Sequence, residues 1–180
     1  MYQWGTFGHG DIRAWGAASD SGYTLRALSW RPRLAIRADI TSGDRNPADR
    51  NLETFNALFP RNSSYFGEIA TVGPANLIDV HPYIEVHPVE SLTIALGADS
   101  LRRQSDRDGV YSPAGILLRS GRRSRATHVG ERVSLGAEWR VDHHFSITAI
   151  YSHFFAGEFI RETGPGKHID HITMWLQYRF

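Results

Sequence analysis

Cysteine is absent from the 180 residues of this chain, which excludes a disulfide framework and a thiolate metal site. The sequence also lacks a run of about eighteen apolar residues, so a conventional transmembrane helix is excluded. Neither sign of charge is in excess. The formal net charge is +1, which gives no indication of a nucleic-acid partner. The length suffices for one domain with a substantial core.

The last nine residues carry the clearest pattern that is present. Polar and apolar positions alternate strictly up to the C-terminus, and a period of two predicts a strand with one apolar face. In bacterial outer-membrane barrels such a face lies against lipid, whereas a soluble sheet would have to bury it beside the terminal carboxylate. We therefore favour an outer-membrane strand. Its apolar positions are Ile172, Met174, Leu176, Tyr178 and Phe180.

The rest of the chain divides at turn residues into strands, with no convincing amphipathic helix. The sequence predicts an all-β fold, an antiparallel meander of about seven to eight strands that forms part of a large transmembrane outer-membrane β-barrel. The expected strands are 11–25, 32–42, 75–87, 92–103, 129–142, 145–160 and 172–180, after a short segment at 2–7.

The predicted connections alternate in length. Those at 27–31, 88–91 and 143–144 are short, and those at 43–74 and 104–125 are long. Short turns at one rim and long loops at the other are typical of membrane barrels, whose long loops lie outside the cell. The arginine-rich segment 119–125 then falls in a long loop. We interpret it as a surface that faces solvent or anionic lipopolysaccharide.

Several segments resemble a known family. The run Tyr-Ser-His-Phe-Phe-Ala-Gly at 151–157 is the most specific, and 137–142 and 161–167 accompany it. Together with 11–15, 34–44, 58–60, 65–68, 73–82 and 109–111, these segments resemble the C-terminal part of the alginate export family. The resemblance implies a Gram-negative outer-membrane porin of about eighteen strands that passes an anionic polysaccharide.

The implied barrel has more strands than this sequence provides. We therefore expect residues 1–180 to form one domain, the C-terminal portion of the barrel, truncated at its N-terminus. The start of the sequence also lacks the basic segment, apolar stretch and cleavage site of an export signal. The resemblance further implies that the closing strand, with Tyr178 and Phe180, is the signal read by the barrel assembly machinery.

The resemblance gives a function to the charged face of the strands. A passage for a uronate polymer needs cations that offset its charge and carboxylates that prevent tight binding. Arginine suits this function because its planar fork binds both carboxylate oxygens. Alternatively, these charges pair across strands and only rigidify the wall. The residues predicted to line the lumen are Arg13, Arg33, Arg37, Asp39, Asp79, His81, Glu85, Asp99, Arg132, Glu138, Arg140 and Arg179.

Two other functions remain open. One is a small eight-stranded barrel that binds an apolar ligand, since alternation does not say which face is wet. The other is an enzyme in which His81 with Asp79 or Glu85 acts as acid and base, but no catalytic motif supports it. The prediction is thus transport without catalysis, cofactor or metal. The expected partners are outer-membrane lipid, the assembly machinery and an anionic polysaccharide, with no nucleic acid.

Overall fold

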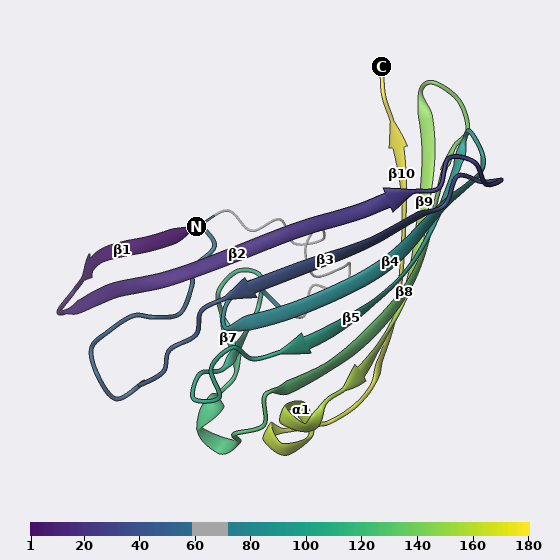
Figure 1. Ribbon diagram of the computed structural model, residues 1–180. Helices are drawn as coiled ribbons and strands as arrows, with labels where there is room; N and C mark the ends of the chain where they lie inside the picture. The colour runs from purple at the N-terminus through teal and green to yellow at the C-terminus, as the bar shows by residue number, and fades with distance from the viewer. Residues whose placement is uncertain (59–71) are drawn as a thin grey trace.

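The computed structural model describes residues 1–58 and 72–180 (Figure 1). The strands are β1 (Tyr2–Phe7), β2 (Gly10–Thr24), β3 (Arg33–Thr41), β4 (Leu77–Val89), β5 (Leu92–Arg102), β6 (Val110–Tyr111), β7 (Leu117–Arg119), β8 (His128–Arg140), β9 (Phe145–Ala156) and β10 (Ile169–Tyr178). A 3₁₀ turn at Gly121–Arg123 and the helix α1 (Glu158–Thr163) complete the elements.

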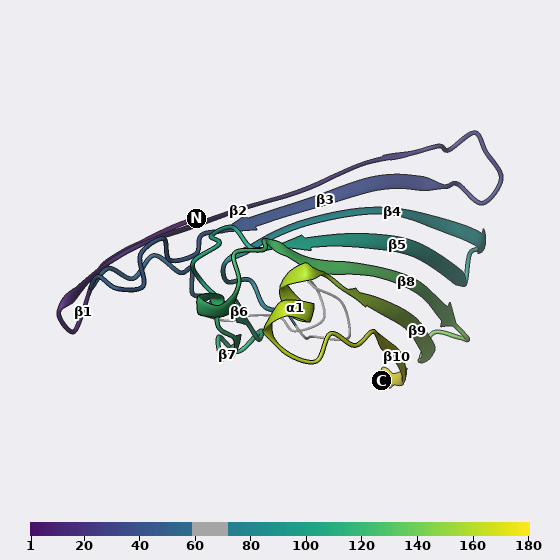
Figure 2. The same cartoon turned by 90° about the horizontal axis from the view of Figure 1, so that it is seen from below.

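Eight strands form one antiparallel sheet in the order β1-β2-β3-β4-β5-β8-β9-β10, which confirms the predicted all-β meander. In the described residues β1 and β10 are the two edges and do not pair with each other, so the sheet is open. The sheet curves strongly, as Figure 2 shows. No helix in the described part of the chain is long and apolar enough to span a membrane.

The pairing register assigns each residue to a face. Phe154 of β9 and Leu101 of β5 lie on the concave face, where α1, β6 and β7 cover one end of the sheet (Figures 1 and 2). Alternation then places the intervening residues on the convex face, which is apolar and exposed. Exposed convex residues include Leu34, Ile36, Val80, Leu96, Val133, Leu135, Ile172, Met174, Leu176 and Tyr178.

The connections alternate in length as predicted. Residues 25–32, 90–91 and 141–144 join strands at one end of the sheet, and 42–76, 103–127 and 157–168 join them at the other. We call the described parts of these last three connections the loop layer. The central part of the loop expected at 43–74, residues 59–71, lies outside the described residues.

Two predictions about the loop layer were wrong. The strand expected at 145–160 ends at Ala156, because α1 begins directly after it. Gly157 permits this turn, since a Cβ there would lie 2.6 Å from the carbonyl carbon of Val129. The loop expected at 104–125 contains the hairpin β6–β7, in which Val110 pairs with Arg119.

Pro82 lies in the interior strand β4 without breaking it. Proline has no amide hydrogen to donate, so an interior position removes one ladder hydrogen bond. The β4–β5 ladder is interrupted between Val80 and Tyr83, while on the other side Pro82 is opposite Ile36 of β3. The strand therefore accommodates the proline where one of its two ladders has a gap.

The hydrophobic core lies between the concave face and the loop layer. Leu77, Leu101 and Phe154 of the sheet pack with Val110 of β6 and Phe159 of α1. Burial of this apolar surface attaches the loop layer to the sheet. The buried apolar core thus lies at the end of the concave face that the long connections cover, and most side chains on the rest of that face are polar or small.

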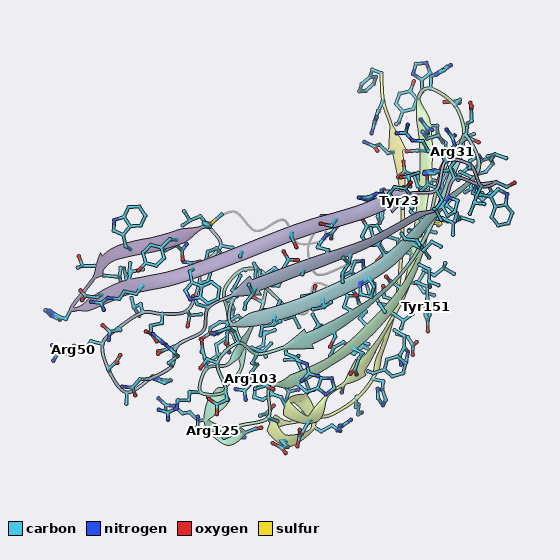
Figure 3. The ribbon with its side chains drawn as sticks, in the orientation of Figure 1. Tyr23, Arg31, Arg50, Arg103, Arg125 and Tyr151 are labelled. Carbon is cyan, nitrogen blue, oxygen red and sulfur yellow. The ribbon has the colours of Figure 1, made fainter. Side chains whose placement is uncertain are left out.

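Arg103 fixes the loop layer from inside. It is 1% exposed, and its guanidinium donates hydrogen bonds to the carbonyls of Asp108, Ser124 and Ala126. The same guanidinium stacks 3.9 Å from the ring centroid of Phe159. Figure 3 shows it between the sheet and the loops. A single cation therefore connects the two ends of the β5–β8 connection to α1.

Candidate functional site

The concave face carries a row of charged side chains that crosses neighbouring strands. Asp20 of β2 is opposite Arg37 of β3, and Arg37 is opposite His81 of β4. The row continues on β5 and β8, where Asp99 is opposite Arg132. His81 connects the two halves, with Nδ1 3.0 Å from Oδ1 of Asp99. Five strands thus place charged or titratable groups at one level of the sheet.

Asp20 organises one end of this row. Its carboxylate lies 3.5 Å from Nη2 of both Arg33 and Arg37, and it accepts a hydrogen bond of 3.3 Å from the hydroxyl of Tyr83. Arg33 in turn donates to the Tyr83 oxygen at 2.9 Å. These side chains are partly exposed, so solutes can reach them from the concave side.

Sequence reasoning missed Asp20 and Tyr83. The segment around Asp20 contains only small residues and no apolar alternation, so nothing in it marked a wall position. The only available signal was the charge on Asp20 in a predicted strand. Tyr83 does alternate with Pro82 and Ile84, but its hydroxyl has a defined role only once β2 and β4 are placed on either side of β3.

Asp99 and Arg132 form a buried pair in the middle of the sheet. Arg132 donates from Nε to Oδ2 of Asp99 at 2.8 Å and from Nη2 to Oδ1 at 2.7 Å. The two residues are 3% and 5% exposed. This bidentate contact offsets part of the free-energy cost of removing both charges from water. This pair is less accessible to solvent than Asp20 and its partners.

Asp39 and Asp79 lie directly opposite each other on β3 and β4, closer to the loop layer. Asp79 is completely buried, and neither of its carboxylate oxygens has a hydrogen-bond partner within the described residues. Like groups at opposed positions on adjacent strands are unfavourable for the sheet. Both were among the residues predicted for the charged face, and the register places them together on the concave side.

Four predicted residues lie nearer the short-turn end of the concave face. Glu85 is opposite Arg33 and lies 3.2 Å from Nε2 of His87, and Glu138 is opposite Thr93. Arg140 and Arg179 are at the rim. The Arg140 guanidinium donates to the carbonyl of Glu90 at 2.6 Å, and the Arg179 amide donates to the carbonyl of His144 at 2.8 Å.

Arg13 does not share the concave face with the other residues predicted to line the lumen. Even-numbered residues of β2, such as Gly16 and Asp20, face the concave side, so Arg13 lies on the opposite face. Its guanidinium is largely exposed and 3.4 Å from Asp11. The prediction placed Arg13 on the inner face together with the charged residues of the other strands. Here β2 extends beyond β3 toward β1, and its inward positions there are occupied by uncharged residues such as Ala14.

We call the eight side chains around the row the charged wall. They contain three arginines and one histidine against four carboxylates: Asp20, Arg33, Arg37, Asp39, Asp79, His81, Asp99 and Arg132. The register also supports the alternative in which charges pair across strands, since Asp99 pairs with Arg132 and Asp20 with Arg33 and Arg37. The wall is therefore polar and close to neutral rather than strongly cationic.

The loop layer holds two further side-chain contacts that involve titratable groups. Arg45 donates from Nε and Nη2 to the two oxygens of Glu53 at 3.0 and 2.6 Å, which holds the pKa of that carboxyl below its ordinary value. Burial and a hydrogen bond to Asp108 raise the pKa of the Tyr111 hydroxyl. Both contacts stabilise the connections that cover one end of the wall.

Nothing in this arrangement forms a metal centre within the described residues, where no group of three or more His, Asp or Glu side chains is suitably placed.

The family model described as Alginate export matches residues 1–172. The chain belongs to the alginate export family. This is a transport family of the outer membrane, and membership supports a role in alginate export. No curated protein gave a significant match.

In this member of the alginate export family, the sheet thus has one polar face and one apolar face. The alternative of an eight-stranded barrel with an apolar interior disagrees with the fold, because the charged wall lies on the concave face and β1 does not pair with β10. Tyr178 is on the convex face of β10, and Phe180 follows it with its ring 5.5 Å from the Tyr178 ring.

Proposed function

We propose that this chain forms part of an outer-membrane passage for an anionic uronate polymer, with the charged wall lining the lumen and no catalytic step. The carrying observation is the division of the sheet into a polar concave face and an exposed apolar convex face. Lipid covers an apolar outer face in membrane barrels, and water fills a polar interior. Large exposed apolar surfaces otherwise mark interaction sites.

The near-neutral wall suits conduction of a polyanion. Arginine forks bind carboxylates well, but a lumen with arginine alone would hold the polymer. The guanidiniums of Arg33 and Arg37 each lie 3.5 Å from the Asp20 carboxylate. A uronate carboxylate would compete with Asp20 for Arg33 or Arg37 and be displaced by it as the chain advances. Binding is then weak at each step and reversible.

The open edges of the sheet indicate how it fits into a larger barrel. Unpaired strand edges are not tolerated in lipid, because their amides and carbonyls lack partners. We propose that these strands form the C-terminal portion of the barrel and that further strands pair with β1, β2 and β10. The loop layer then lies outside the cell, and β10 with Tyr178 and Phe180 is the segment read by the assembly machinery.

The test is conductance of the assembled protein in planar bilayers, with oligouronates added to one side. Asp20→Asn removes the competing carboxylate, so we expect longer current blocks and higher anion selectivity. Arg33→Gln with Arg37→Gln should shorten the blocks and lower anion selectivity. Arg13→Gln removes the same charge from the opposite face of β2 and is the matched control, which should behave as the wild type.

The proposal is supported if Asp20→Asn lengthens the current blocks and the double arginine variant shortens them. If oligouronates do not block the wild-type current, the protein does not pass this polymer. If all variants block like the wild type, the charged wall does not contact the polymer, and the passage must be lined by other strands.

A further inference from the structure

Two long connections from different parts of the sequence meet in the loop layer. The β3–β4 connection approaches the β5–β8 connection, and backbone groups hold them together. Gly43 donates its amide hydrogen to Oε1 of Gln104 at 3.0 Å, and Asp44 donates its own to Oδ2 of Asp108 at 2.9 Å. The Ser105 hydroxyl donates to the Asp44 carbonyl at 2.7 Å. The junction is therefore a defined contact between two loops.

A cleft of about 390 Å³ lies at this junction, between the segment 46–48 on one side and Arg107, Arg122 and Arg125 on the other. We call it the arginine cleft. Its lining contains three arginines and no carboxylate. A neighbouring cleft shares Arg107 and Arg125 with it and adds Arg45 and Asp106. Arginines of the β3–β4 and β5–β8 connections thus line two adjoining clefts of the loop layer.

These arginines differ from those of the charged wall. Within the described residues, the side chains of Arg107 and Arg122 form no ion pair, and Arg125 has only a long contact of 3.8 Å with the exposed carboxylate of Asp106. Arg45 in the neighbouring cleft is already occupied by Glu53. Like charges this close, with little compensation inside the chain, leave a positive potential in the cleft that attracts an anion.

The backbone below the arginine cleft is fixed. Gly121 packs so closely on the first part of the same connection that a Cβ would lie 2.2 Å from the Asp108 carbonyl oxygen, and the Ser120 hydroxyl accepts a hydrogen bond from the Arg122 amide. Arg103 holds the other side through the carbonyls of Asp108 and Ser124. Binding there would cost little backbone ordering, because the positions of the arginines are set in advance.

We propose that the arginine cleft binds carboxylate groups of the anionic polysaccharide as it passes the loop-layer end of the barrel. This inference rests on the proposed function. Planar guanidinium forks match carboxylates, and their exposure keeps each contact weak enough to release. A lipid phosphate is less suited, because the loop layer lies over the concave side of the sheet, whereas lipid would cover the convex face (Figure 2).

The experiment measures binding of a fluorescent oligouronate of defined length to the detergent-folded protein at low salt. The variant carries Arg107→Gln, Arg122→Gln and Arg125→Gln. The control carries Arg13→Gln, Arg50→Gln and Arg102→Gln, which removes three exposed arginines outside both clefts. We expect the cleft variant to lose about tenfold or more in affinity, since three salt-screened contacts disappear, and the control to bind like the wild type.

A second variant with lysine at the three cleft positions keeps the charge and removes the fork. It should bind with intermediate affinity, and heat-modifiable gel mobility verifies that every variant is folded. Unchanged affinity in the glutamine variant overturns the inference. So does a loss of binding to lipopolysaccharide vesicles with unchanged oligouronate binding, because the cleft would then be a lipid site.

Failure of the proposed function gives a different result. If oligouronate binds the cleft but never blocks the bilayer current, the protein binds the polymer without passing it. If it blocks the current and the cleft variant binds as tightly as the wild type, the passage stands and the arginine cleft is not part of it.

Discussion

Arg132 of β8 and Asp99 of β5 face each other across the sheet and are joined by two hydrogen bonds of 2.8 and 2.7 Å. Both side chains are almost completely buried, so each compensates the desolvated charge of the other. His81 lies 3.0 Å from the same carboxylate. The pair fixes how β5 and β8 oppose each other, and it is thus a structural element inside a wall in which Asp20, Arg33 and Arg37 are more exposed.

Arg132→Met tests this relationship. It leaves the Asp99 carboxylate buried beside His81 alone, and we expect the free energy of unfolding to fall by about 3 kcal/mol or more. The double variant Arg132→Met with Asp99→Leu removes both charges and should recover most of this loss. Urea titration of the detergent-folded protein measures both. If the double variant is as unstable as the single one, the pair does not act as a compensated unit.

Gly43→Ala should loosen the loop layer. A Cβ at this position would lie 2.0 Å from Oδ1 of Asn76, which accepts a hydrogen bond from the Ser105 amide. Moving the buried Asn76 breaks that bond and those it donates to the carbonyls of Ser105 and Gly109, at a cost of about 2 kcal/mol or more. Limited proteolysis should then cleave the 103–127 connection faster.

The matched control for this substitution is Gly136→Ala. Its Cβ would meet only side-chain atoms of Ile150, at 3.5 Å or beyond, which is ordinary contact. We expect no change in proteolysis. Equal cleavage rates in the two variants would contradict the role assigned to Asn76.

The ion pair of Arg45 and Glu53 predicts a pH dependence. The hydrogen bonds from Arg45 lower the pKa of Glu53 in the folded protein, so folding is favoured above the ordinary value of 4.5, and this contribution is lost as the pH falls below it. Arg45→Gln should therefore cost stability at pH 7 and less at pH 3.5. Arg45 is largely exposed, so solvent screens the pair and the effect is small.

Chemical unfolding at the two pH values measures the effect of this pair. Glu53→Gln serves as the control because it has no carboxyl to titrate. It should abolish any further effect of Arg45→Gln at either pH. A constant difference between the Arg45 variant and the wild type across this range would contradict the assigned pKa shift.

Phe180→Ala separates folding stability from assembly. The Phe180 side chain is fully exposed and contacts the Tyr178 ring, so the stability of the folded barrel should change by less than about 0.5 kcal/mol. The amount inserted in the outer membrane should nevertheless fall several-fold if the closing strand is read during assembly. Comparison of refolding yield in detergent with membrane content in cells distinguishes the two. Leu176→Ala, on the same face of β10, is the control.

Much of the fold could be predicted because polar and apolar residues alternate along the strands, so that one face of the sheet is polar and the other apolar. Ile172, Met174 and Leu176 do share the convex face, and Asp79, His81 and Glu85 share the concave one. The helix α1 could not be found in the same way. It is short, follows β9 after a single residue and buries Phe159, so the apolar residues of its sequence continue the strand pattern.

The sequence by itself determined the main strands, which of their residues share a face, and the family. Alternation and specific runs such as 151–157 are local properties of the chain. Only the tertiary structure decided which charges meet. The pairing of Asp99 with Arg132 depends on the register of β5 and β8. That Asp20 and not Arg13 lies on the concave face depends on how β2 pairs with β1 and β3. The arginine cleft needs two loops, about sixty residues apart in sequence, to be held together by hydrogen bonds such as that from Gly43 to Gln104.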